Sequence, residues 1–130
     1  MKRIEVVAAI IISENKILCV QRGENKYNYI SKKYEFPGGK IEIGESKEEA
    51  IKREIYEELR MKIGELKEFV TVYHEYPDFQ LTMHSYICTC EDSSLELTEH
   101  IDFQWLGKNE LRGLDWAAAD VPIVEKLMSL

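Results

Sequence analysis

The chain has 130 residues and a formal net charge of −7 at pH 7, with 45% hydrophobic and 32% charged residues. This length predicts a single domain over residues 1–130 that can bury a hydrophobic core. The negative charge argues against a protein that binds nucleic acid, and the apolar runs are too short to predict a membrane span.

Two strands are predicted near the N-terminus, over residues 3–12 and 16–20, because both are rich in β-branched and aliphatic residues and turn residues separate them. The basic start and apolar run also suggest a signal peptide. However, Glu5 interrupts the run and no small-residue cleavage site follows, so we expect a cytoplasmic protein. The odd number of cysteines without a zinc-ligand spacing favours reduced thiols at Cys19, Cys88 and Cys90.

A polar, tyrosine-rich segment over residues 21–35 predicts a long loop, and loops of this length are often functional. The Pro-Gly-Gly sequence at 37–39 predicts a break in regular structure. A helix should begin after Ser46, which can form a capping box with Glu49. Its apolar side chains recur at i, i+4 and i+8 and predict the buried face: Ile51, Ile55 and Leu59.

Three further strands are predicted, the first two joined as a hairpin by a Pro-Asp turn: residues 66–76, 79–90 and 101–106. Residues 91–99 predict an acidic loop. A final helix is predicted over Val121–Met128, with Asp120 as its N-cap and proline in its first turn. This order of strands and helices predicts an α+β fold with a mixed sheet between helices.

Three carboxylates on the first predicted helix stand at i, i+3 and i+4, at Glu54, Glu57 and Glu58. They would project from one side of the helix, away from its apolar face, where their charges repel. A hard divalent cation, Mg²⁺ or Mn²⁺, would offset this repulsion, because such ions prefer carboxylate oxygens. The spacing therefore predicts a metal site.

The segment that contains these carboxylates resembles the signature of the Nudix hydrolases, G-x5-E-x7-R-E-U-x-E-E-x-G-U, in which U is a bulky apolar residue. The matching residues are Gly39, Glu45, Arg53, Glu54, Ile55, Glu57, Glu58 and Met61. The second glycine of the pattern is replaced by Arg60. That position ends the helix, so we expect at most roughly 1 kcal/mol of local strain there.

The resemblance implies that Glu54, Glu57 and Glu58 bind the metal together with the carbonyl of Gly39 or Gly38. It implies that Arg53 orients the carboxylates, reaching Glu57 at i+4, and that Glu45 supports the loop. The general base is expected to be Glu54. Glu99, which precedes the strand at 101–106, is an alternative base or an additional metal ligand, or else a solvated loop residue.

Outside the signature, the segments EVVAAIII, YEFPGGKIE and LDWAAADVPIVEKL resemble MutT-like nucleoside triphosphate diphosphatases of the CTP pyrophosphohydrolase and 8-oxo-dGTP diphosphatase type. Matched positions imply phosphate contacts from Arg22 and Lys40. They imply a base pocket bordered by Phe36 and Asp78, in which Asp120 bonds the base edge. An ionised Asp120 only accepts hydrogen bonds, which favours bases that carry an amino group.

Several alternatives remain open. Instead of bordering a base pocket, Phe36 could be a plain core residue and Asp78 a plain turn residue. The loop at 23–33 is either a lid over the nucleotide or a solvated surface loop. Pro77 stands where a subgroup that hydrolyses ADP-ribose has proline, although it also fits the hairpin turn. A nucleotide-binding module without catalysis, or an acidic protein-binding surface at 91–99, would be a different class of function. The expected partner is a small-molecule nucleotide, and the chain is expected to be a monomer or homodimer.

Overall fold

The computed structural model describes residues 1–130, which form seven strands, two α-helices and two short 3-10 helices. The strands are β1 (Lys2–Ser13), β2 (Lys16–Gln21), β3 (Tyr34–Glu35), β4 (Gly38–Lys40), β5 (Ile63–Glu75), β6 (Phe79–Cys90) and β7 (Asp102–Leu106). The helices are α1 (Lys47–Leu59), η1 (Lys108–Gly113), η2 (Ala118–Asp120) and α2 (Val121–Met128).

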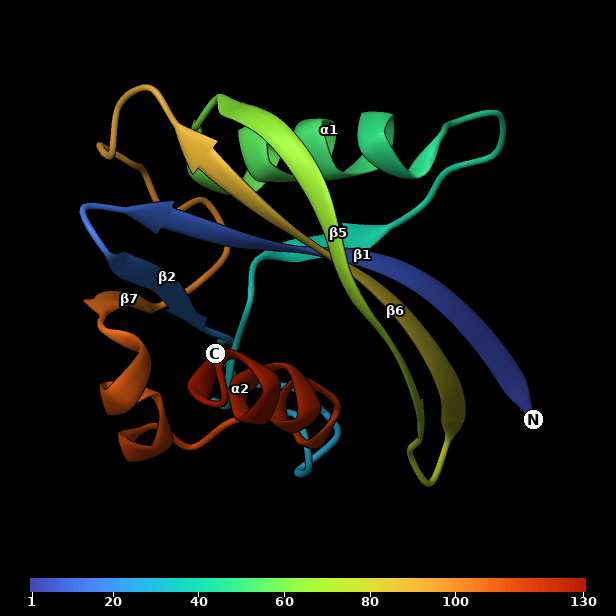
Figure 1. Ribbon diagram of the computed structural model, residues 1–130. Coiled ribbons are helices and arrows are strands. Elements are labelled where there is room, and N and C mark those ends of the chain that lie inside the picture. The colour runs from blue at the N-terminus through green and yellow to red at the C-terminus, as the bar shows by residue number, and fades with distance from the viewer.

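The strands form a mixed sheet in which β3, β2, β1, β6 and β5 follow one another, while β4 pairs with β1 and β7 with β2. β1 runs parallel to β6, and the other pairs are antiparallel. Helix α1 covers one side of the sheet and α2 lies on the other (Figure 1). The predicted α+β fold, with a mixed sheet between helices, is confirmed.

The protein has two hydrophobic cores, one on each face of the sheet, and β1 contributes side chains to both. It can do so because alternate residues of a strand point to opposite faces. Val7, Ala9 and Ile11 pack in the core that contains the apolar face of α1. Ala8 and Ile10 pack in the core that contains α2. The strand is therefore buried on both faces at its centre, which explains its unbroken apolar sequence.

The Pro-Gly-Gly sequence does not end regular structure, contrary to the prediction. Gly38 and Gly39 begin β4, which pairs with Val7 and Ala8 of β1. A side chain on Gly38 would collide with the backbone oxygen of Val7, so glycine here permits close strand approach. The loop predicted over 21–35 likewise ends in β3.

Helix α1 begins as predicted, with the reciprocal capping box between Ser46 and Glu49. It ends at Arg60, which adopts the left-handed conformation at φ 55° and donates its backbone N–H to Tyr56. The predicted strain at the substituted glycine therefore has a structural basis, because a side chain disfavours this backbone region.

Replacing Arg60 with glycine should stabilise the protein by about 0.5–1 kcal/mol, because the relief of left-handed strain exceeds the added chain entropy of glycine. Urea denaturation measures the difference. Lys62→Gly is the matched control, since Lys62 has no positive φ and glycine there should destabilise. Equal destabilisation by both substitutions would contradict this account of the helix end.

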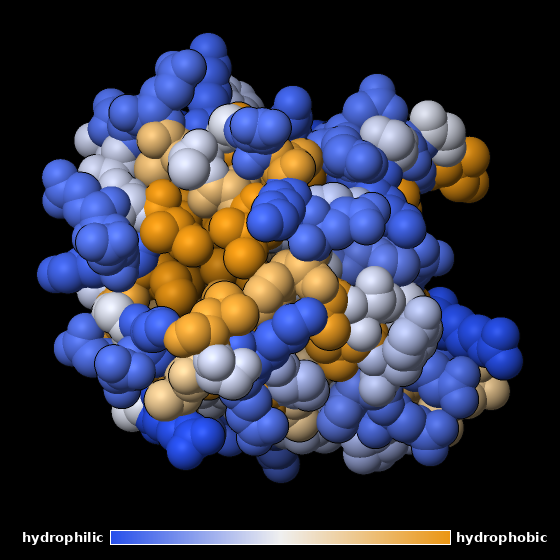
Figure 2. Space-filling view, viewed as in Figure 1, coloured by the Kyte–Doolittle hydropathy of each residue, from blue (hydrophilic) through white to orange (hydrophobic).

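Hydrophobic side chains gather on the face of the molecule where β5 crosses the sheet (Figure 2). Phe69 and Val70 of β5 and Ile87 of β6 are partly buried against the core that contains α2. None of the helices combines the length and the hydrophobicity that crossing a bilayer requires.

Candidate active site

A single cleft of about 1260 Å³ connects the C-terminal half of α1 with the loop after β2 and the ends of β5 and β6. Most of the predicted site residues line it: Arg22, Phe36, Gly39, Lys40, Glu54, Glu58, Asp78, Glu99 and Asp120. Glu45, Arg53 and Glu57 do not line it. They lie beside it in a network of ion pairs.

Arg53 is the centre of this network. Its guanidinium group donates to both oxygens of Glu45, at 2.6 and 2.9 Å, and to Glu54 and Glu57, each at 2.9 Å. It also donates to the backbone oxygen of Lys40 at 3.0 Å, which ties α1 to β4. The predicted contact between Arg53 and Glu57 is present. Arg53 thus offsets the repulsion among carboxylates and fixes their orientation.

Glu45 supports the loop before α1, as the resemblance implied. It accepts hydrogen bonds from the backbone N–H of Glu42 and from Arg53, and these bonds lower its pKa to about 2. The same contacts stabilise the charged form of Arg53, because Glu45, Glu57 and Glu54 raise the pKa of its guanidinium group. Both groups are therefore charged at neutral pH.

Glu58 lies inside the protein, which contradicts the predicted clean separation between the apolar and acidic faces of the helix. Its side chain is 5% exposed, and Oε1 has no hydrogen-bond partner. Burial is the main cause that raises its pKa to about 9, with further contributions from Glu54, Glu35 and Glu99. A buried carboxylate with an unsatisfied oxygen requires a cation or a proton.

The residues of this site fit a hard divalent cation. A side chain on Gly39 would collide with the carboxyl group of Glu54, so β4 and α1 approach one another only with glycine at this position. Glu58, whose Oε1 has no hydrogen-bond partner, lines the same cleft. The carboxylates do not converge as a ready-made group of three ligands, because Glu54 and Glu57 are turned toward Arg53.

The acidic loop at 91–99 covers the C-terminal end of α1. Thr98 donates its hydroxyl to the backbone oxygens of Glu57 and Glu58, at 2.8 and 3.0 Å, and its N–H to Glu58 at 3.1 Å. These bonds satisfy carbonyls that a helix end leaves free. Leu95 and Leu97 pack against the core beneath α1, so the loop is more than a solvated charged surface.

Asp120 is not an N-cap, contrary to one of its two predicted roles. It has helical dihedrals at the end of η2, and its side chain makes no capping bond. Its Oδ1 instead accepts the backbone N–H of Phe36 at 3.0 Å. Asp120 is buried in the wall of the cleft, and desolvation, followed by the charge of Glu35, raises its pKa well above the usual range for Asp. A neutral carboxyl group can also donate a hydrogen bond.

Phe36 is both a core residue and part of the cleft wall. Its ring stacks on Trp116 with centroids 4.8 Å apart. The Ala119 N–H donates to the hydroxyl of Tyr76 at 3.0 Å, which fixes η2 against the end of β5. Asp120 is therefore held from two sides in a rigid wall.

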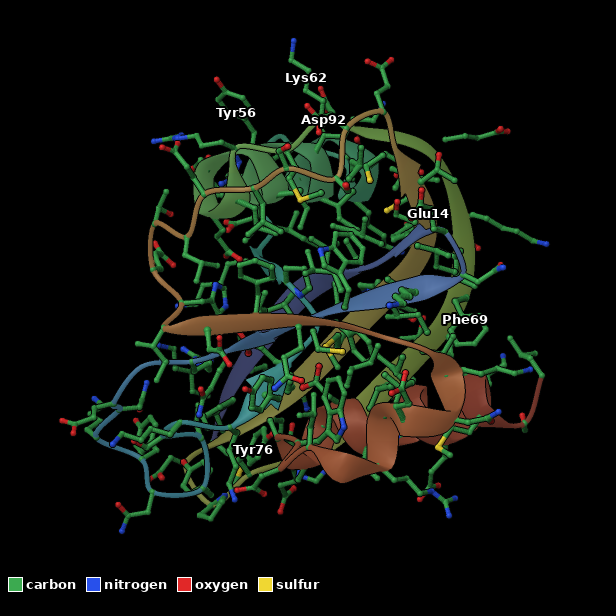
Figure 3. The ribbon with its side chains drawn as sticks, turned by 90° about the vertical axis from the view of Figure 1, so that its left-hand side faces the viewer. Glu14, Tyr56, Lys62, Phe69, Tyr76 and Asp92 are labelled. Atoms are coloured by element: carbon green, nitrogen blue, oxygen red, sulfur yellow. The ribbon has the colours of Figure 1, made fainter.

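The tyrosines of the loop at 23–33 pack against the β5–β6 hairpin. Tyr29 stacks on Tyr27 and on Tyr76, with ring centroids 5.2 and 5.1 Å apart, and donates its hydroxyl to Asp78 at 2.5 Å. Figure 3 shows Tyr76 near this loop, in the lower part of the view, and away from Phe69. Asp78 is thus occupied by Tyr29, while Tyr27 lines the cleft.

Glu35 and His100 are among the cleft residues that could not be recognised in the sequence. The Nε2 atom of His100 lies 2.9 Å from one oxygen of Glu35, and Arg22 lies 3.6 Å from the other. The only sequence signal was that each stands beside a predicted site residue, Glu35 before Phe36 and His100 after Glu99.

A family model described as the NUDIX domain matches residues 6–126. The chain belongs to the Nudix family. This confirms the family inferred from the signature, despite arginine at the second glycine position, and with it the class of hydrolases that act on acid anhydrides.

Relatives of this Nudix protein have two kinds of name. An 8-oxo-dGTP diphosphatase of Escherichia coli K12 is 30% identical, with 100% of both chains covered. A CTP pyrophosphohydrolase of the same organism is 34% identical and covers 100% of this chain and 95% of its own. The solution structure of a MutT protein from methicillin-resistant Staphylococcus aureus 252 is 42% identical, with a TM-score of 0.73, and covers 99% of this chain and 98% of its own.

Proposed function

We propose that this protein is a divalent-metal-dependent enzyme that hydrolyses a nucleoside triphosphate to a nucleoside monophosphate and pyrophosphate. The substrate is of the 8-oxo-dGTP or (d)CTP type. One observation carries the proposal: two carboxyl groups of the Nudix signature, Glu54 and Glu58, line the same cleft as the cationic side chains of Arg22 and Lys40 and a wall that contains the buried carboxyl group of Asp120. Names of full-length relatives support it.

In this proposal, Mg²⁺ or Mn²⁺ is held by Glu54, Glu57, Glu58 and the carbonyl of Gly39, with Glu99 as a further ligand. Such an ion neutralises phosphate charge and lowers the pKa of a bound water. Glu54 is the general base, because Arg53 holds its Oε1 and leaves Oε2 available. Glu57 reaches the cleft by turning from Arg53, since its side chain is 51% exposed.

Arg22 and Lys40 contact the phosphates, because both are cationic and line the cleft near the carboxylates. The base lies against Phe36 and meets Asp120. Burial raises the pKa of Asp120 and so favours its protonated form, which can donate to a base oxygen or nitrogen as well as accept, whereas the ionised form only accepts.

Replacing Asp120 with alanine should raise KM roughly tenfold for the preferred nucleotide and change kcat little, because one buried hydrogen bond to the base is lost. Asp120→Asn is the matched control. It keeps the carbonyl oxygen that Phe36 N–H requires and can still donate, so its KM should stay near that of the wild type. An equal loss of turnover on every nucleotide would contradict a base contact.

The function is tested with a panel of canonical, oxidised and methylated nucleoside triphosphates, plus ADP-ribose, each with Mg²⁺. Products are resolved as monophosphate plus pyrophosphate or as diphosphate plus phosphate. Release of orthophosphate from triphosphates would overturn the reaction proposed here. Preference for ADP-ribose would place the enzyme in the subgroup that hydrolyses ADP-ribose. Binding without turnover would indicate a non-catalytic module.

A cytoplasmic location also belongs to this proposal. It is supported by three free thiols, at Cys19, Cys88 and Cys90, of which the first two are buried.

A further inference from the structure

The segment from Thr98 to Ile101 crosses the cleft between two fixed points. At one end, Thr98 bonds the last carbonyls of α1. At the other end, the N–H of Ile101 donates to the backbone oxygen of Gln21, in β2, at 3.0 Å. Glu99 and His100 lie between these points and line the cleft. Backbone bonds fix the ends of the segment, but the orientation of its central residues depends on their side chains.

His100 supplies the central attachment. Its side chain is 5% exposed, and Nε2 is 2.9 Å from Oε2 of Glu35 in β3. A carboxylate oxygen only accepts, so Nε2 carries the proton and donates. The other ring nitrogen, Nδ1, is buried without any partner. The ring is therefore held in place by the bond to Glu35, at the expense of leaving Nδ1 unsatisfied.

Glu35 connects this attachment to the phosphate side of the cleft. Its second oxygen, Oε1, lies 3.6 Å from the guanidinium group of Arg22. Glu35, which directly precedes the base-wall residue Phe36, thus contacts two residues from other parts of the chain, Arg22 and His100. One carboxylate receives a donor from the segment that carries Glu99 and faces the cation that the proposed function assigns to phosphate binding.

We propose that His100 and Glu35 are positioning residues: their hydrogen bond orients Glu99 toward the carboxylates of α1 and, through Glu35, keeps Arg22 at the phosphate side. Neither residue contacts the reacting atoms. This inference rests on the proposed metal-dependent function. It predicts that one hydrogen bond, remote in sequence from the Nudix signature, controls both metal affinity and phosphate binding.

The test compares His100→Leu, which removes the donor, with His100→Gln, whose amide nitrogen can take the place of Nε2. Mn²⁺ binding to the nucleotide-free protein is measured by electron paramagnetic resonance, and kcat and KM are measured with Mg²⁺ and the preferred triphosphate. His84→Leu is the matched control, because His84 forms a similar pair with Glu5, at 2.8 Å, outside the cleft.

His100→Leu should weaken Mn²⁺ binding about tenfold or more and raise KM for the nucleotide, as loss of a group that orients metal ligands commonly does. His100→Gln should restore both to within about threefold of the wild type, and His84→Leu should leave both unchanged. Thermal denaturation confirms folding. If the leucine variant does not fold, His100→Asn, whose shorter amide cannot reach Glu35, replaces it.

Unchanged Mn²⁺ binding in a folded His100→Leu or His100→Asn variant would overturn the inference. Failure of His100→Gln to restore binding would also overturn it, because the effect would then come from packing. A wild-type protein that binds Mn²⁺ but hydrolyses no triphosphate would refute the proposed function alone, since the metal measurement still decides the positioning role. A wild-type protein that binds no Mn²⁺ would refute both.

Discussion

Replacing Glu58 with glutamine is expected to lower turnover about a thousandfold while making the metal-free protein more stable at pH 8. Turnover falls because an amide is a poor ligand for a hard cation. Stability rises because the buried carboxyl group of Glu58 must take up a proton when the chain folds at pH 8, whereas glutamine is neutral in both states. The gain should be on the order of 2 kcal/mol. Steady-state kinetics and urea denaturation measure the two effects.

The sign of the pH dependence follows from the raised pKa of Glu58, which is about 9 in the folded protein against 4.5 for an ordinary glutamate. Between these values the folded state binds more protons than the unfolded state at this group, so the contribution of Glu58 to stability is fully present below about pH 4.5 and is lost as pH rises toward 9. Glu58→Gln should remove this loss. Mg²⁺ should offset it in the wild type, because a bound cation favours the ionised carboxylate.

Two variants separate these effects. Glu57→Gln should also reduce turnover but bring no gain in stability, because Glu57 is half exposed and paired with Arg53. Glu65→Gln alters an exposed glutamate of β5 and should change neither quantity. A Glu58→Gln protein that is less stable than the wild type at pH 8 without metal would show that the buried carboxyl group is ionised and paired there, and that burial does not raise its pKa.

The local features of α1 could be predicted because they depend on residues close in sequence. The Ser46–Glu49 capping box, the apolar stripe and the Arg53–Glu57 contact all follow from helical spacing. The burial of Glu58 could not be predicted. It depends on residues 91–99 folding over the end of the helix, and nothing in the spacing of the helix indicates that contact.

Asp120 shows how the surrounding fold overrides the local preference of aspartate for an N-cap position. Aspartate before a proline-containing helix favours an N-cap, but the chain enters α2 from η2, so Asp120 already has helical dihedrals. Its carboxyl group then bonds Phe36, which is 84 residues away in sequence. The Glu35–His100 pair is separated by 65 residues and was invisible for the same reason. Polar contacts between residues far apart in the sequence leave no regular spacing from which they could be predicted.

Replacing Arg53 with methionine should reduce turnover about a hundredfold without removing any metal ligand. Methionine keeps much of the aliphatic volume but none of the donors that hold Glu45, Glu54 and Glu57. Those carboxylates would then repel one another, and Glu54 would lose the bond that orients it as the proposed base. Arg53→Lys should recover little, because an ammonium group cannot donate in the same fork. Steady-state kinetics at saturating Mg²⁺ measures the loss.

The same variant should change the response to acid. Arg53 is the main cause that lowers the pKa of Glu45 to about 2, so this pair stabilises the wild type above about pH 4.5 and loses its contribution as pH falls toward 2. In Arg53→Met that acid-side loss should be largely absent. Lys52→Met, at the neighbouring exposed helix position, should leave both turnover and the acid response unchanged. Full activity in Arg53→Lys would mean that positive charge alone suffices and that the geometry of the guanidinium group does not position the carboxylates.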